Sequence, residues 1–143
     1  MKKLLLFTVI ITAFGWAANA QKKSIKVPAK VASAFKEKFP GASALSWEME
    51  NAKEYEVNFK ENGKPVSANF DAAGTWMETE AGIDIASLPG AVSATATKKA
   101  GNKITAAYRI EKSDGSTTFE VEIRNGKKKS EMILNPDGTP LKK

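Results

Sequence analysis

The side chains that could do chemistry in this sequence are mainly carboxylates, because its 143 residues include no histidine and no cysteine. This composition excludes thiol nucleophiles, Ser-His-Asp arrangements, imidazole bases and the usual zinc sites. Paired carboxylates could hydrolyse a glycosidic bond if they lay about 5–10 Å apart in a cleft, but no motif supports such a site. The glutamates also lack the Asp-rich loop that calcium sites use. We therefore expect no catalytic residues, no cofactor and no metal.

The glutamates fall at alternate positions of predicted strands, so they would share one face of a sheet. The whole chain carries a formal charge of +6, which makes an acidic face an uneven distribution. One interpretation is a docking face for a basic or polar protein partner. The other is an ordinary solvated face with cross-strand ion pairs. The glutamates in this pattern are Glu48, Glu50, Glu54, Glu56, Glu78, Glu80, Glu111, Glu120 and Glu122.

Trp76 is the aromatic residue that could anchor a partner on this face. It shares parity with Glu78 and Glu80, which predicts an exposed indole, but a bulge after Gly74 would turn it into the core instead. Trp47 is expected in the core. These patterns give the predicted partner-binding set: Glu48, Glu56, Asn58, Trp76 and Arg109.

The first twenty residues have the pattern of a secretory signal peptide. Lys2 and Lys3 precede an apolar run from Leu4 to Ala18, and Ala18-Asn19-Ala20 forms an A-x-A cleavage site. The run is shorter than the ~20 apolar residues that a membrane span needs. We expect a periplasmic or secreted protein that leaves the membrane after cleavage, with residues 21–26 as a polar lead-in. Its lysines fall mostly in turns and at the tail, so no nucleic-acid partner is expected.

Residues 27–80 predict a helix followed by a four-stranded antiparallel meander. The helix has a proline in its first turn, where the missing N–H costs nothing, and it ends at Pro40-Gly41. Its apolar stripe consists of Val31, Phe35 and Phe39. The following residues alternate between apolar and polar, as strands do, and Asn62-Gly63 is a strong hairpin signal. Strands are expected near residues 45–50, 54–60, 66–70 and 75–80.

Residues 88–141 repeat this order, which indicates two copies of one unit, 27–80 and 88–141, within a single domain at 27–143. Val27-Pro28 and Leu88-Pro89 open the two copies. The second helix, expected at 88–99, has smaller apolar residues than the first. Its strands are expected at 104–112, 117–124, 128–134 and 139–141, with Ile104, Ala106, Tyr108 and Ile110 on one face. The predicted fold class is α+β, with one continuous eight-stranded sheet or two abutting halves.

These motifs together resemble the PepSY-like proteins with a β-lactamase-inhibitor-like fold, which are common among exported proteins of Bacteroidetes. The resemblance rests on Val27-Pro28, Phe39-Pro40-Gly41, Tyr55-Glu56-Val57 and the run from Phe70 to Trp76. The second copy departs from it, with Ala100-Gly101-Asn102 where the first has Phe-Pro-Gly. The resemblance implies a tandem helix-plus-meander fold whose curved sheet could hold a protein or peptide. It implies no general activity, because a fold does not fix a function.

The function predicted from these patterns is binding of a protein or peptide partner through the open side of the sheet. The protein would be an exported monomer that is not an enzyme and that inhibits or chaperones an exported enzyme. An aromatic anchor would supply affinity, and the acids would supply orientation. The alternative is a carrier of a small ligand, or an envelope-stress carrier, with a cavity between helices and sheet.

Overall fold

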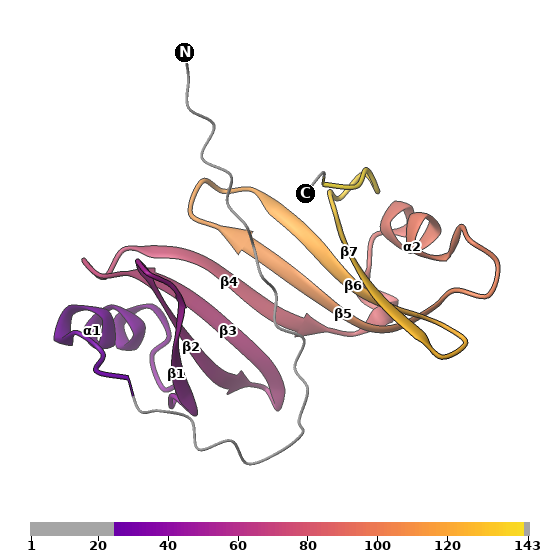
Figure 1. Cartoon of the computed structure of the whole chain (residues 1–143). Coiled ribbons are helices and arrows are strands. Elements are labelled where there is room, and N and C mark those ends of the chain that lie inside the picture. Colours follow the sequence, from indigo (N-terminus) through magenta and orange to yellow (C-terminus); the bar gives the residue numbers. More distant parts are fainter. Residues whose placement is uncertain (1–24, 142–143) are drawn as a thin grey trace.

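The computed structural model describes residues 25–141 and shows two helices at opposite ends of one sheet (Figure 1). The predicted signal peptide and most of the polar lead-in lie outside the described residues. Between residues 25 and 141, no helix is long and apolar enough to cross a membrane. The elements are α1 (Ala29–Lys38), β1 (Ser46–Asn51), β2 (Glu54–Glu61), β3 (Lys64–Asp71), β4 (Trp76–Ile83), a 3₁₀ turn (Ile85–Ser87), α2 (Gly90–Thr97), β5 (Lys103–Lys112), β6 (Thr117–Asn125) and β7 (Lys128–Leu134).

All seven strands form one continuous sheet in sequence order, and each is antiparallel to the next. The sheet therefore has seven strands among the described residues, where the sequence predicted one sheet of eight strands or two abutting halves. The expected strand at 139–141 is reduced to a single bridge between Leu134 and Pro140. A proline has no N–H to extend a ladder, which explains why the pairing stops there.

Both helices pack on the same face of the curled sheet, as the strand register shows. Val66 pairs with Ala81, Ala81 with Arg109, and Arg109 with Phe119. This row joins the residues beneath α1 to those beneath α2, so all four side chains lie on one side. We call this side the helix face. The opposite side, which carries Glu56, Ser67, Glu80, Tyr108 and Glu120, is the open face.

The first core lies between α1 and strands β2 and β3, and the predicted stripe of α1 forms its upper layer. Val31 and Phe35 are buried, and Phe39 packs beside them. The Phe35 ring meets the Trp47 ring edge-on, with centroids 5.7 Å apart, which confirms that Trp47 belongs to this core. The sheet contributes Val57, Phe59, Val66, Ala68 and Phe70.

In the second core the helix contributes less than in the first, and α2 is shorter than the helix predicted at 88–99. Leu88 and Pro89 are extended, so α2 begins at Gly90 and buries only Val92 and Ala96. The side chains beneath it are Ala107, Phe119, Val121, Ile123 and Leu134. The phenylalanines of α1 thus have no counterparts on α2.

Two turn glycines fix the distance between each helix and the sheet. Gly74 has φ +87°, and a Cβ there would lie 2.9 Å from the Lys30 carbonyl oxygen in α1. Gly138 has φ +81°, and a Cβ there would lie 2.5 Å from the Ala91 carbonyl oxygen in α2. Only glycine combines this left-handed backbone with so close an approach.

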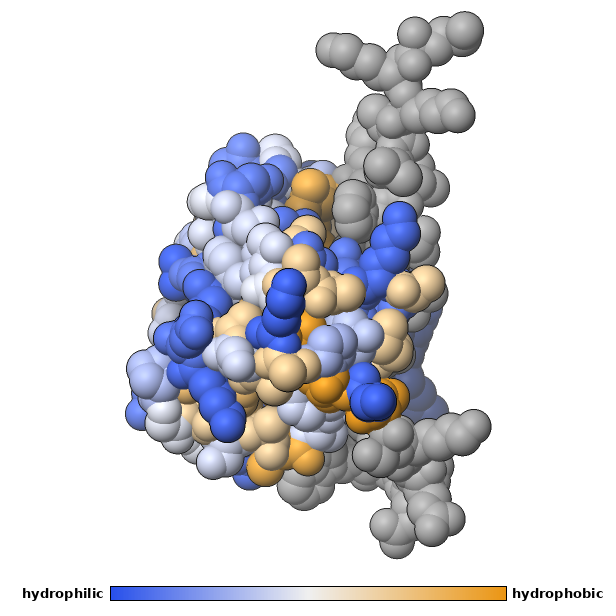
Figure 2. Space-filling view, turned by 90° about the vertical axis from the view of Figure 1, so that its left-hand side faces the viewer, coloured by the Kyte–Doolittle hydropathy of each residue, from blue (hydrophilic) through white to orange (hydrophobic). Residues whose placement is uncertain are grey.

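The outer surface on the side of α1 is mixed in character. Seen from that side, hydrophilic residues alternate with more hydrophobic ones (Figure 2). Leu45 and Met49, beside and within edge strand β1, are among the exposed large apolar residues. The polar part of this surface is expected of α1, because only one stripe of the helix faces the core.

Candidate functional site

Glutamates form a diagonal band across the open face from β1 to β7. Glu48 pairs with Glu56, and Asn69 joins Glu56 to Glu78. At the other end of the band, Glu122 pairs with Glu131. We call this set the acidic band: Glu48, Glu50, Glu54, Glu56, Glu78, Glu80, Glu120, Glu122 and Glu131.

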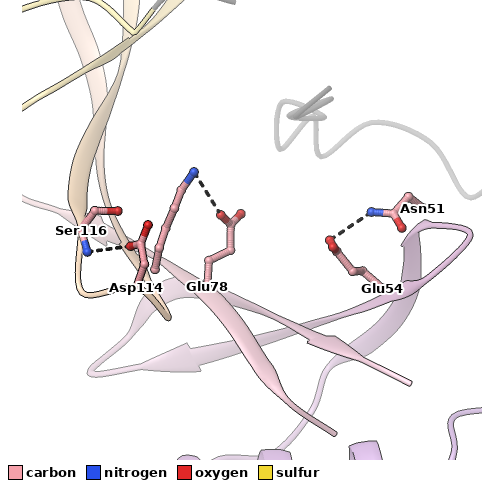
Figure 3. A network of polar contacts seen from close by, with 6 residues as sticks. Asn51, Glu54, Glu78, Asp114 and Ser116 are labelled. Atoms are coloured by element: carbon pink, nitrogen blue, oxygen red, sulfur yellow. Dashed lines mark hydrogen bonds and ion pairs between the residues drawn. The ribbon is translucent and has the colours of Figure 1, made fainter. Parts of the chain in front are cut away.

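A lysine and an asparagine side chain contact two members of the band. Lys112 Nζ lies 3.9 Å from Glu78 Oε2, and Asn51 Nδ2 donates to Glu54 Oε2 at 3.0 Å (Figure 3). Figure 3 also shows the turn beyond Lys112, where the Ser116 backbone N–H donates to Asp114 Oδ1 at 2.8 Å. The charge of Lys112 lowers the pKa of Glu78, but burial and the charges of Glu54 and Glu56 act the other way, and the net direction is upward.

Burial, together with the charges of neighbouring glutamates, raises the pKa of three carboxylates of the band, those of Glu50, Glu78 and Glu80. Burial, aided by the charges of Glu120, Glu78, Glu56 and Glu131, raises the pKa of Glu80 from 4.5 to about 8. Burial and contact with Glu56 raise the pKa of Glu50 to about 7. A positive charge brought to this face would lower the pKa of both Glu50 and Glu80.

Two buried polar atoms on the same face have no hydrogen-bond partner among the described residues. They are Asn58 Oδ1 and Thr118 Oγ1, in side chains that are 8% and 6% exposed. Asn58 follows Glu56 on the open side of β2, and Thr118 precedes Glu120 on the open side of β6. Buried polar atoms are normally paired, so these two indicate places where a ligand group could donate.

Tyr108 lies near the middle of the band. It pairs with Gly82 on one side and with Glu120 on the other. Burial raises the pKa of Tyr108 to about 12, and the charges of Glu122, Glu80, Glu120 and Glu131 act in the same direction. An aromatic ring among carboxylates is an arrangement that recognises cations.

The sequence matches, in two overlapping segments at residues 19–66 and 53–141, the family model described as "Putative beta-lactamase-inhibitor-like, PepSY-like". The chain belongs to this PepSY-like family. The resemblance seen in the sequence motifs is thereby confirmed. No curated protein matches the sequence.

Solved structures from Bacteroides share the fold. A DUF2874 family protein from Bacteroides uniformis has a TM-score of 0.72 at 20% identity, over 82% of this chain and 88% of that one. A structure described as "putative periplasmic proteins" from Bacteroides eggerthii has a TM-score of 0.73 at 17% identity, over 82% and 88%. A BLIP-like protein from Bacteroides fragilis has a TM-score of 0.66 at 23% identity, over 87% and 89%. At these identities the likeness concerns the fold alone.

In this PepSY-like protein, three of the predicted binding residues lie together on the open face. Glu48 and Glu56 form a cross-strand pair, and Asn58 follows two residues along β2. The alternation of β1 and β2 places them there, as expected from the sequence.

Trp76 does not join them, because a bulge reverses its direction. Asn69 pairs with Glu78 and Phe70 with Trp76, so β4 holds one extra residue, Met77, between these pairs. Trp76 therefore packs on the core beneath α1. Its Nε1 donates to Thr79 Oγ1 at 2.9 Å, and Lys38 Nζ lies 3.6 Å from its ring centroid. The expectation of an exposed anchor on the acidic face is corrected; the bulged alternative holds.

Arg109 also lies on the helix face, where it pairs across strands with Ala81 and Phe119. The register of β5 shifts between Ile104 and Ala106, and this bulge reverses the direction of the residues that follow. Ile104 thus packs with the second core, whereas Ala106, Tyr108 and Ile110 face the open side. Arg109 forms an ion pair with Glu111 on its own side, so neither belongs to the acidic band.

The sequence pattern did not predict two residues of the site, Tyr108 and Glu131. That pattern groups Tyr108 with Ile104 on one apolar face, and the bulge that separates them has no local signal. Glu131 is absent from the predicted set of acids. It lies between Lys129 and Ile133 on the open side of β7, and the alternation of that strand could have identified it.

Proposed function

We propose that this PepSY-like protein is an exported, non-enzymatic binding protein that engages a protein or peptide through its open face. The observation that carries the proposal is the acidic band. A chain of net positive charge collects nine glutamates, Glu48 to Glu131 as defined above, on the sheet face opposite its helices. Repelling carboxylates cost stability, and a fold that retains them gains from a partner that neutralises them.

The shape of the face supports a macromolecular partner. Seven strands in one continuous sheet offer a long surface on which an extended segment or a protein loop can lie. Binding there would cover the partner's own surface, so steric occlusion is the mode of action that we propose, as an inhibitor or a chaperone of an exported enzyme. Export is supported by the signal-like residues 1–20 and by the periplasmic description of one protein of the same fold.

We also infer that the two halves are copies of one unit. Gly74 and Gly138 support this inference, because each closes a turn against the second residue of a helix, Lys30 in α1 and Ala91 in α2. Each turn also begins with a residue whose backbone N–H bonds to the fifth residue, Asp71 to Thr75 and Asn135 to Thr139. The second unit lacks the full fourth strand of the first.

Site-specific photo-crosslinking in the cell that exports the protein tests the proposed function. A photoreactive residue would replace Glu56 on the open face in one variant and Glu37, exposed on α1, in the matched control. We expect a discrete crosslinked product from position 56 and none from position 37. Equal products from both positions, or a product from position 37 alone, would rule out the open face as the binding surface.

A further inference from the structure

We propose that the partner presents a lysine or arginine side chain to the middle of the open face, where Tyr108 and four glutamates form a recognition site for one cationic group. The glutamates are Glu80, Glu120, Glu122 and Glu131. This inference rests on the proposed function and names the chemistry of the partner at one position. We call these five residues the cation site.

The strand register places the five side chains on one face of neighbouring strands, β4 to β7, with Glu131 opposite Glu122 on β7. Tyr108 on β5 lies directly opposite Glu120 on β6, and directly opposite residues in a sheet have Cβ atoms about 5 Å apart. Glu80 and Glu122 flank this row in opposite directions along the strands, Glu80 opposite Ile110 and Glu122 opposite Ala106. All four carboxylates act on the Tyr108 hydroxyl through their charges.

The cross-strand neighbour of Tyr108 on the β4 side is Gly82, which has no side chain of its own. Pro65 Cδ and Cγ lie 3.3 Å from the position that a Cβ at Gly82 would take, so the proline ring lines the far side of this glycine. A guanidinium or ammonium group can approach an aromatic ring within about 6 Å and gain from its quadrupole. The carboxylates at the edge of the ring would then supply charge-assisted hydrogen bonds.

Thr118 provides an independent sign that a ligand is expected here. It lies two residues before Glu120 on the same side of β6 and is 6% exposed, yet its Oγ1 has no hydrogen-bond partner among the described residues. Asn58 Oδ1, near Glu56 at the other side of the band, is in the same condition. A hydroxyl oxygen such as Thr118 Oγ1 can accept a hydrogen bond, and lysine and arginine side chains carry only donors.

A metal ion is the weaker occupant. No group of three or more metal-ligating side chains with suitable geometry occurs among residues 25–141. The carboxylates of the band are spread along a diagonal, whereas a divalent cation needs six or more oxygen atoms around one point.

Calorimetric titration of the purified protein with a blocked hexa-arginine peptide tests the cation site, with blocked hexaglutamine and calcium chloride as comparison ligands. We expect the arginine peptide to bind and the other two not to bind. Glu80→Gln and Tyr108→Leu should each weaken binding about tenfold, whereas Tyr108→Phe keeps the ring and should retain most of the affinity. Glu61→Gln, which makes the same replacement at an exposed position at the end of β2, is the matched control and should have little effect.

Each remaining outcome contradicts the proposal. Equal losses in Glu80→Gln and Glu61→Gln would mean that only net charge attracts the peptide, and binding of calcium alone would make the band a metal site. Glu80→Gln removes a repelled carboxylate and should fold well, so the test does not depend on Tyr108→Leu. If the arginine peptide fails to bind while position 56 still crosslinks, only the cation site is wrong. If the peptide binds and position 56 does not crosslink, the proposed function is wrong.

Discussion

Trp76 is held by three contacts on the helix face, and each of them belongs to the fold. The indole N–H donates to Thr79, the ring lies under the Lys38 ammonium group, and its edge packs on the first core. We expect Trp76→Ala to lower the free energy of unfolding by about 2 kcal/mol, because a half-buried aromatic ring is removed. Urea denaturation measures the loss, and crosslinking from position 56 should persist. Unchanged stability together with lost crosslinking would show that Trp76 belongs to the binding surface.

Thr118 and Thr79 form a matched pair of threonines on opposite faces of the central strands. Thr118 Oγ1 is buried without a partner among residues 25–141, whereas Thr79 Oγ1 accepts a hydrogen bond from Trp76. Replacement by valine removes the hydroxyl and keeps the shape. We expect Thr118→Val to raise the free energy of unfolding by about 1 kcal/mol and Thr79→Val to lower it by about the same amount. Equal destabilisation in both variants would show that Thr118 has a partner in the folded protein.

At the scale of elements, the turns that end β3 and β7 determine how the helices are seated. Gly74→Ala and Gly138→Ala each place a methyl group against a helix carbonyl and strain a left-handed backbone. Gly63 has φ +79°, and apart from its two chain neighbours no described residue lies within 4 Å of the position that a Cβ would take, so Gly63→Ala carries only the backbone cost. We expect losses of about 1 kcal/mol for Gly63→Ala and clearly more, about 2–4 kcal/mol, for the other two. Similar losses at all three glycines would mean that the helices yield to the added methyl groups.

Local signals in the sequence predict most elements, and the bulges explain the errors. The apolar stripe of α1 and the Asn62-Gly63 turn involve residues close in the chain, so the sequence alone shows them. The Gly74 turn signals the bulge in β4, but the pairing with β3 decides whether Trp76 is reversed, and the register shift in β5 has no local signal. Because one added residue reverses every following side chain, the sequence pattern places Arg109 on the wrong face and leaves two alternatives for Trp76, while it places the acids of β1 and β2 correctly.

For the whole molecule, the acidic band predicts how stability depends on pH. The pKa values of Glu50 and Glu80 in the folded state, about 7 and about 8, exceed their ordinary value of 4.5. The folded protein then binds protons more tightly than the unfolded chain, and its stability falls as pH rises from about 5 to 8. Asp71, Asp114 and Asp137 have lowered pKa values, so their ionisation affects stability only below this pH range.

We expect the melting temperature to fall by several degrees between pH 5 and pH 8.5, equivalent to about 1–2 kcal/mol. Glu80→Gln should flatten this dependence and stabilise the protein at pH 8, whereas Glu37→Gln on α1 should leave it unchanged. Thermal unfolding followed by circular dichroism measures all three proteins. A melting temperature that rises over the same pH range would contradict the predicted repulsion within the band.

The role of the open face is tested most directly by carboxyl footprinting with mass spectrometry. A water-soluble carbodiimide and glycine ethyl ester would label the glutamates of the purified protein and of the protein within an envelope extract. We predict that labelling of Glu48, Glu56 and Glu78 falls in the extract, while labelling of Glu37 and Glu61 stays the same. Unchanged labelling of the acidic band, with protection of Glu37 or Glu61 instead, would show that the partner binds elsewhere.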